Sequence, residues 1–152
     1  MKKQITHIRD IDEIEKHLKE AQTGVLCISL SNDKLMQVAC NFVYLDKNIY
    51  VYLDSTEENF EHIKYGSAGI FTISRNEKIH PKNKEFTYKF SFNTINGEIR
   101  ELDDAKLQEQ VYELYRIKYS SSINADDYKI AENLKPIILD TIEIKSLVEE
   151  GI

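Results

Sequence analysis

The chain has few cysteines and only short apolar runs, which argues against a disulfide-rich, a secreted or a membrane-spanning protein. Its only cysteines, Cys27 and Cys40, both lie in apolar stretches typical of strands. We therefore expect buried reduced thiols rather than a disulfide framework, which suits the cytoplasm. The sequence has no amino-terminal apolar segment of the secretory kind and no uncharged run long enough to span a bilayer, so it predicts a soluble, unsecreted protein with no membrane partner.

Basic residues are also scarce. The chain has 20 lysines and arginines against 26 acidic residues, and its formal net charge is −6. Because a nucleic-acid surface needs basic residues concentrated on one face, no nucleic-acid partner is expected. The four histidines lack metal-ligand spacing, and no nucleophile elbow, glycine-rich phosphate loop or zinc cluster is present. The sequence predicts no metal site and leaves the catalytic residues unknown.

Hydrophobic periodicity predicts one domain, residues 1–152, of mixed strands and helices. Asp10 is the expected N-cap of the first helix and Gly24 its stop, and Asn96 and Gly97 favour a bend or bulge in a long strand. The segment after residue 74 is expected to be a polar loop through Lys84, and 120–135 a functional lid or a mobile segment. The predicted helices cover 11–21, 55–65 and 104–118, and the predicted strands 25–30, 35–44, 48–53, 67–74, 86–102 and 136–145.

The strand predicted at 35–44 has no plainly polar face. Met36, Val38 and Cys40 alternate with Leu35 and Ala39, so both faces need covering. One face can fill a barrel. The other can meet the chain's own helices or a second subunit in a two-fold homodimer.

This order of elements resembles the split-barrel superfamily of pyridoxamine 5'-phosphate oxidase-like flavoproteins, and especially its small bacterial members. The resemblance covers residues 13–145 and implies a mainly β fold with flanking helices, a six- to seven-stranded antiparallel split barrel. The segments that carry it are Gly24–Ser29, Asn41–Tyr44, Ile49–Tyr52, Ser55–Ile63 and Asn96–Ile99.

The resemblance implies FMN bound at a dimer interface, with the flavin ring along the strand at 41–44. The matching positions are Asn41, Phe42, Val43 and Tyr44, where Phe42 or Tyr44 could pack near the ring. The implied function is that of an FMN-dependent oxidoreductase acting on a small molecule that the sequence does not identify. Two alternatives stay open: a haem-binding or haem-degrading protein, and a split barrel without cofactor that serves as a binding or regulatory module.

The phosphate site that the resemblance implies falls on Ser55, Thr56 and Asn59, with Asn59 where such proteins usually carry a lysine. Glu57 and Glu58 depart from the pattern, since carboxylates there would repel a phosphate. Either these residues only cap their own helix, or a basic segment compensates across a dimer interface. That segment is Arg75, Lys78, His80, Lys82, Lys84 and Lys89, with Lys89 taken as a cofactor residue. In the haem alternative, His62 or His80 would be the axial ligand.

Overall fold

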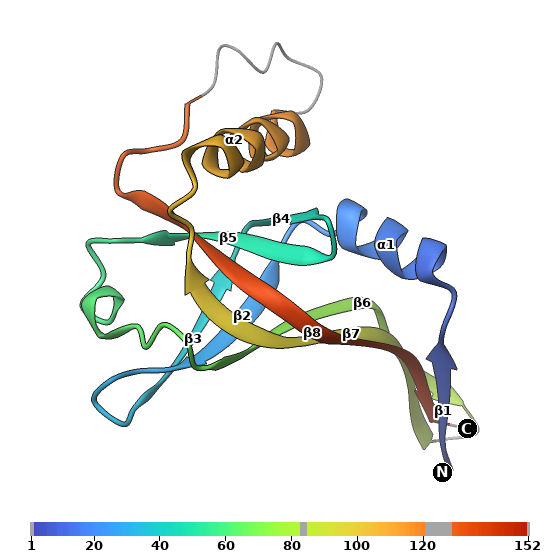
Figure 1. Ribbon diagram of the computed structural model, residues 1–152. Helices are drawn as coiled ribbons and strands as arrows, with labels where there is room; N and C mark the ends of the chain where they lie inside the picture. The colour runs from blue at the N-terminus through green and yellow to red at the C-terminus, as the bar shows by residue number, and fades with distance from the viewer. Residues whose placement is uncertain (1, 83–84, 121–128, 152) are drawn as a thin grey trace.

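The computed structural model describes residues 2–82, 85–120 and 129–151. Figure 1 shows its strands forming a strongly curved sheet, with the two helices outside it. The elements, in chain order, are β1 (Lys3–Ile8), α1 (Ile11–Glu20), β2 (Gly24–Ser29), β3 (Leu35–Cys40), β4 (Phe42–Leu45), β5 (Asn48–Asp54), the 3₁₀ turn η1 (Phe60–His62), β6 (Ala68–Lys82), β7 (Glu85–Glu101), α2 (Ala105–Tyr119) and β8 (Leu134–Gly151).

The sheet is antiparallel and open. Its strand order is β3-β2-β6-β7-β8-β5-β4, with β1 paired to β8. Strands β3 and β4 stand at opposite ends of this order although only Asn41 separates them in the chain. The sheet therefore curls back on itself without closing, which confirms the predicted split barrel with flanking helices. It has eight strands rather than six or seven, because β1 and the break at Asn41 each add one.

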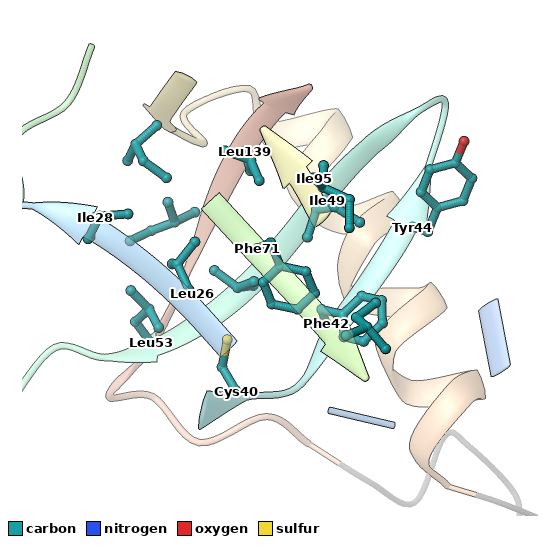
Figure 2. Packing of buried hydrophobic residues seen from close by; sticks show 14 of the residues in the cluster. Leu26, Ile28, Cys40, Phe42, Tyr44, Ile49, Leu53, Phe71, Ile95 and Leu139 are labelled. Carbon is teal, nitrogen blue, oxygen red and sulfur yellow. The ribbon is translucent and has the colours of Figure 1, made fainter. Parts of the chain in front are cut away.

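Two apolar clusters hold the fold together. The larger fills the barrel, where the rings of Phe42 and Phe71 meet edge-on with centroids 4.9 Å apart (Figure 2). The smaller lies between α2 and the outer face of β4 and β5, and it buries Val43, Tyr50 and Val111. Burying each such side chain contributes roughly 1.5–3 kcal/mol. The chain's own helix thus covers one part of the outer sheet surface.

Both helices begin where the sequence predicts. The carboxylates of Asp10 and Asp104 each accept a hydrogen bond of 3.0 Å from the amide two residues further on. The first helix, however, ends at Glu20, and Gly24 belongs to β2. At Gly24 a Cβ would overlap the ring of Phe71, so this glycine permits close packing and is not a helix stop. No helix in the described ranges is long and apolar enough to cross a membrane.

The prediction of a helix at 55–65 is wrong, because the segment forms turns of another type. Only η1 forms there, and four backbone hydrogen bonds between Asp54 and Ile63 each span three residues instead of four. The apolar anchors Phe60 and Ile63 are three residues apart, which suits turns of this tighter kind. Because no helix begins at this segment, it has no row of aligned amides with a dipole that would favour an anion.

The polar loop predicted after residue 74 is also wrong. Strand β6 continues to Lys82 and β7 begins at Glu85, and these two residues pair in register. Lys84 and the side chains of Lys78, His80 and Lys82 lie outside the described part of the chain. Backbone pairing extends this hairpin where the sequence offers no clear apolar pattern.

The irregularity predicted in the long strand is confirmed. The register between β7 and β8 shifts between Asn96 and Gly97, and a Cβ on Gly97 would overlap the backbone of Asp140. The final strand is longer than predicted, because it also pairs with β1. Of the connection predicted at 120–135, residues 121–128 lie outside the described ranges.

Candidate functional site

A cavity of about 410 Å³ opens at the split of the barrel. It lies between the free edge of β3 and the end of β5, with the segment before η1 and the side of α2 as its other walls. The lining residues that matter most are Val38, Asn41, Tyr52, Asp54, Glu57, Asn59, Phe60 and Tyr115.

Strand β3 gives this cavity a row of backbone donors and acceptors. It is the last strand of the sheet order and, among the described residues, pairs only with β2, so no described strand pairs with its other edge. The edge ends at Asn41, which leaves the ladder. The amide of Asn41 donates to the carbonyl oxygen of Gln22 at 3.1 Å and accepts from the hydroxyl of Tyr115 at 3.4 Å. Both contacts fix Asn41 at the cavity wall.

The end of α2 supports the same wall from outside. The Tyr119 hydroxyl accepts from the amide of Phe42 at 3.1 Å and donates to the carbonyl oxygen of Gln22 at 2.7 Å. The ammonium group of Lys118 donates to the carbonyl oxygen of Phe42 at 2.9 Å. Burial lowers the pKa of Lys118 to about 8. Side chains of α2 therefore replace the backbone partners that a continuous ladder would give to Phe42.

An ionised carboxylate stands at one side of the cavity. Asp54 accepts from the hydroxyl of Thr56 at 2.6 Å, from the side-chain amide of Asn133 at 2.9 Å and from the Thr56 backbone amide at 2.9 Å. These bonds, first among them the one from the Thr56 hydroxyl, hold the pKa of Asp54 below its ordinary value. The side chain of Glu57 lines the same cavity. This part of the site is consequently acidic.

The remaining wall is aromatic and chemically inert. The rings of Tyr52 and Tyr115 meet edge-on with centroids 4.8 Å apart, and burial raises the pKa of Tyr52 to about 12. Burial likewise raises the pKa of the Cys40 thiol to about 12, so this cysteine stays protonated and is a poor nucleophile. These groups provide packing surface for a flat molecule rather than acid–base chemistry at neutral pH.

The structure brings together only some of the residues predicted for the cofactor site. Asn41 and Asn59 line the cavity. Ser55 and Thr56 lie beside it, held by Asn133 and Asp54. Lys89 pairs in register with Glu150 near the carboxyl end of β8, and Figure 1 shows that both chain ends lie away from α2.

The other three predicted residues are buried in the chain's own clusters. The rings of Phe42 and Tyr44 belong to the barrel core, with 0% and 8% of their surface exposed, and Val43 packs under α2. Figure 2 shows Phe42 pointing toward Phe71. Their side chains do not line the cavity, and their assignment to a cofactor stays a prediction.

Sequence reasoning missed the contribution of α2. Tyr115 lies 74 residues after Asn41, yet its hydroxyl reaches that side chain. The sequence places Tyr115 in the apolar stripe of a helix, where it is indistinguishable from a core residue. Its spacing of four residues from Tyr119 is the only available signal that one helix face carries two hydroxyl groups.

Histidines contribute little to this region. The imidazole of His62 lies 3.6 Å from the Glu61 carboxylate, and His62 is not among the residues that line the cavity. The side chain of His80 lies outside the described residues. Within the described ranges, no three His, Cys, Asp or Glu side chains form a group that could hold a metal ion.

Comparison with known proteins gives matches in structure only. No protein-family model matches the chain, and no curated protein matches it in sequence. The fold is similar to that of a Bacteroides thetaiotaomicron protein provisionally described as a 5-nitroimidazole antibiotic resistance protein. That match has a TM-score of 0.77 at 13% identity and covers 99% of this chain and 90% of the other.

Two further solved structures widen the comparison. The FAD binding protein from Mycobacterium smegmatis matches with a TM-score of 0.62 at 12% identity, covering 96% of this chain and 99% of the other. HutZ, the haem storage protein from Vibrio cholerae, matches with a TM-score of 0.67 at 14% identity, covering 95% and 97%. At such low identities the likeness shows the fold alone. The chain therefore has the split-barrel fold of the pyridoxamine 5'-phosphate oxidase-like proteins, as the sequence resemblance implied.

Proposed function

We propose that the chain binds a flavin, with FMN the expected form, and that the flavin ring occupies the cavity at the barrel split. The observation that carries this proposal is the cavity itself. Its volume of about 410 Å³ lies within the range of small-molecule sites, and it combines apolar walls with a few polar groups.

The lining residues fit a flat ring with one polar edge. Val38, Tyr52 and Phe60 offer apolar surface, while Asn41 and the free edge of β3 offer donors and acceptors. When bound, the flavin would supply the electron-transfer chemistry, and the chain would position it and keep water away. The chain would then act as a flavin-dependent oxidoreductase, and its substrate would be a small molecule of unidentified class.

We further propose that two copies form a two-fold dimer through the outer face of β3, β2 and β6. On this face Leu35 is 74% exposed and Ile70 42% exposed, and both point away from the core. Gln37 and Ile70 flank Cys27 on neighbouring strands, which makes the face continuous. A second copy would bury this surface and stand next to the free edge of β3.

A blocking substitution tests the flavin site. Asn59 lines the cavity, and its side chain makes no capping bond to η1, so Asn59→Trp should fill the cavity without unfolding the turn. Glu61→Trp, on the exposed side of the same turn, is the matched control. In titrations followed by flavin fluorescence, we expect Asn59→Trp to weaken FMN and riboflavin binding by at least about tenfold and Glu61→Trp to leave it unchanged.

The same preparations separate the alternatives. Wild-type protein that binds neither FMN nor riboflavin would overturn the proposal. A haem-binding protein would show a Soret band on titration with haem, lost in His62→Ala if that imidazole is the axial ligand. A chain that takes up neither cofactor would be the binding or regulatory module.

A further inference from the structure

Two carboxylates line the cavity at the barrel split, and neither is paired with a cation in the described part of the chain. Asp54 ends β5, and Glu57 belongs to the turn that follows it. The ion pairs among the described residues include neither of them. This side of the cavity therefore carries negative charge that no described residue neutralises.

The carboxylate of Asp54 is held by only one of its two oxygens. The Oδ1 atom accepts three hydrogen bonds, from the hydroxyl and the backbone amide of Thr56 and from the side-chain amide of Asn133. The Oδ2 atom has no partner among the described residues. Because both oxygens of an ionised carboxylate are acceptors, the three bonds orient the group and leave Oδ2 for a ligand.

The turn after β5 brings Glu57 to the same cavity. Its backbone amide donates to the carbonyl oxygen of Asp54 at 3.2 Å, which closes the turn over residues 54–57. The side chain of Glu57 is exposed, and it makes no hydrogen bond or ion pair with a described residue. Its carboxylate is therefore able to turn toward a ligand in the cavity without breaking such a contact.

Tyr52 adds a polar group that lacks a partner. It is only 8% exposed and lines the cavity, yet its hydroxyl makes no hydrogen bond with a described residue. The fully buried atoms without a partner include the hydroxyl of Tyr44 but not that of Tyr52, so the Tyr52 hydroxyl is reachable from the cavity. Since buried tyrosine hydroxyls usually have a partner, this one indicates a place for a ligand atom.

These groups together favour one sign of ligand charge. A phosphate or a carboxylate placed beside Asp54 and Glu57 would meet charge of its own sign. An ammonium group has only donors, and it would form charge-assisted hydrogen bonds with both carboxylates. The aromatic rings of Tyr52, Phe60 and Tyr115, which also line the cavity, attract cations and cover apolar groups.

We infer that Asp54 and Glu57 bind the positively charged group of the small molecule on which the flavin acts, and that this substrate is an organic amine with an apolar body. The inference rests on the proposed flavin function. The Tyr52 hydroxyl would accept a further hydrogen bond from the amine. The same carboxylates would disfavour substrates that carry a phosphate, and a cofactor phosphate would have to lie away from them.

A matched pair of probes tests this charge preference. Phenethylamine and phenethyl alcohol share one carbon skeleton, and only the amine is charged near neutral pH. In titration calorimetry of FMN-saturated protein at fixed ionic strength, the amine should bind at least about tenfold more tightly than the alcohol. Asp54→Asn with Glu57→Gln should reduce this preference to roughly twofold. The control Glu58→Gln removes an exposed carboxylate that does not line the cavity, and it should keep the full preference.

A single variant keeps the test decisive if the double variant does not fold. Glu57→Gln should lower the preference in part, and it removes no hydrogen bond or ion pair to a described residue. Equal wild-type affinity for the two probes, or a preference that persists in both variants, would overturn the amine site and leave the flavin proposal standing.

The same titrations without FMN separate the amine site from the flavin site. Displacement of the amine by FMN would show that the two ligands need the same space, and it would overturn the substrate role. A wild-type protein that prefers the amine but binds no flavin would overturn the proposed function and leave a cavity that binds organic cations.

Discussion

The ammonium nitrogen of Lys118 lies 3.7 Å from the centre of the Phe42 ring and 2.9 Å from the carbonyl oxygen of the same residue. One residue of β4 thus receives both a cation–π contact and a charged hydrogen bond from α2. The Tyr119 hydroxyl binds the amide of Phe42 as well. The break between β3 and β4, which opens the barrel, is therefore stabilised by the carboxyl end of α2, through two residues that lie 76 and 77 positions after Phe42 in the chain.

Burial of this lysine predicts a pH dependence of stability. The folded pKa of Lys118, about 8, lies below its ordinary value of 10.5, because burial disfavours the charged form more than the contacts with Phe42 favour it. Between these values the unfolded chain binds more protons, so the free energy of unfolding rises with pH. From about pH 7.5 to about pH 9.5 we expect this group to raise the free energy of unfolding by roughly 1–2 kcal/mol, a value already reduced to allow for its partial exposure.

Urea unfolding of the wild type and of Lys118→Met at both pH values measures this contribution. The rise should be missing in Lys118→Met and retained in Lys106→Met, which removes an exposed lysine from the first turn of the same helix. An equal rise in all three proteins would show that another group titrates.

Local signals in the sequence predict the elements that local chemistry forms. Asp10 and Asp104 cap the two helices. Asp46 and Lys47 form the two-residue turn between β4 and β5, both with positive φ, 49° and 67°. The helix predicted at 55–65 failed because its few apolar residues equally satisfy a 3₁₀ turn. The loop predicted after residue 74 failed because strand pairing there leaves little trace in the side-chain pattern.

The candidate site was predictable only on the strand side. Asn41 and Asn59 carry the resemblance and line the cavity. Tyr115 comes from a helix whose position depends on long-range packing against β4 and β5. No local signal in one sequence fixes such packing. The acidic side of the cavity was foreseen only as the departure at Glu57 and Glu58, of which Glu57 lines the cavity.

The close approach of Gly24 to Phe71 predicts a steric coupling. Gly24→Ala places a methyl group inside the volume of the Phe71 ring, so it should destabilise the fold by about 1–3 kcal/mol. Phe71→Leu removes the ring edge but leaves a void, which also lowers stability. In the double variant the added methyl group would fill part of that void. A double-mutant cycle from urea unfolding should give a combined loss smaller than the sum of the two, whereas additive losses would show that the ring moves aside freely.

The exposed face of β3 predicts the assembly state. If two copies pair through this face, light scattering should give twice the chain's 17.8 kDa. Leu35→Glu with Ile70→Glu places charges at the interface and should yield the single-chain mass. Ile142→Glu changes a residue that is 80% exposed on β8, and it should leave the dimer intact. A wild-type protein that is already monomeric, or a dimer unaffected by the paired substitution, contradicts the proposed interface.

The unpaired side-chain amide of Asn93, inside the barrel, predicts that an apolar substitution at this position stabilises the fold. Asn93 is fully buried, and neither atom of its side-chain amide has a hydrogen-bond partner among the described residues. Its cross-strand neighbour Ser146 has an unpartnered hydroxyl as well. Since burying an unsatisfied amide costs free energy, Asn93→Val should raise the free energy of unfolding by about 1 kcal/mol. The control Thr94→Val, on the opposite face of β7, should change it by no more than about 0.5 kcal/mol. A loss of stability in Asn93→Val under urea unfolding would mean that this amide is satisfied in solution and that the polar pair at Asn93 and Ser146 contributes to the fold.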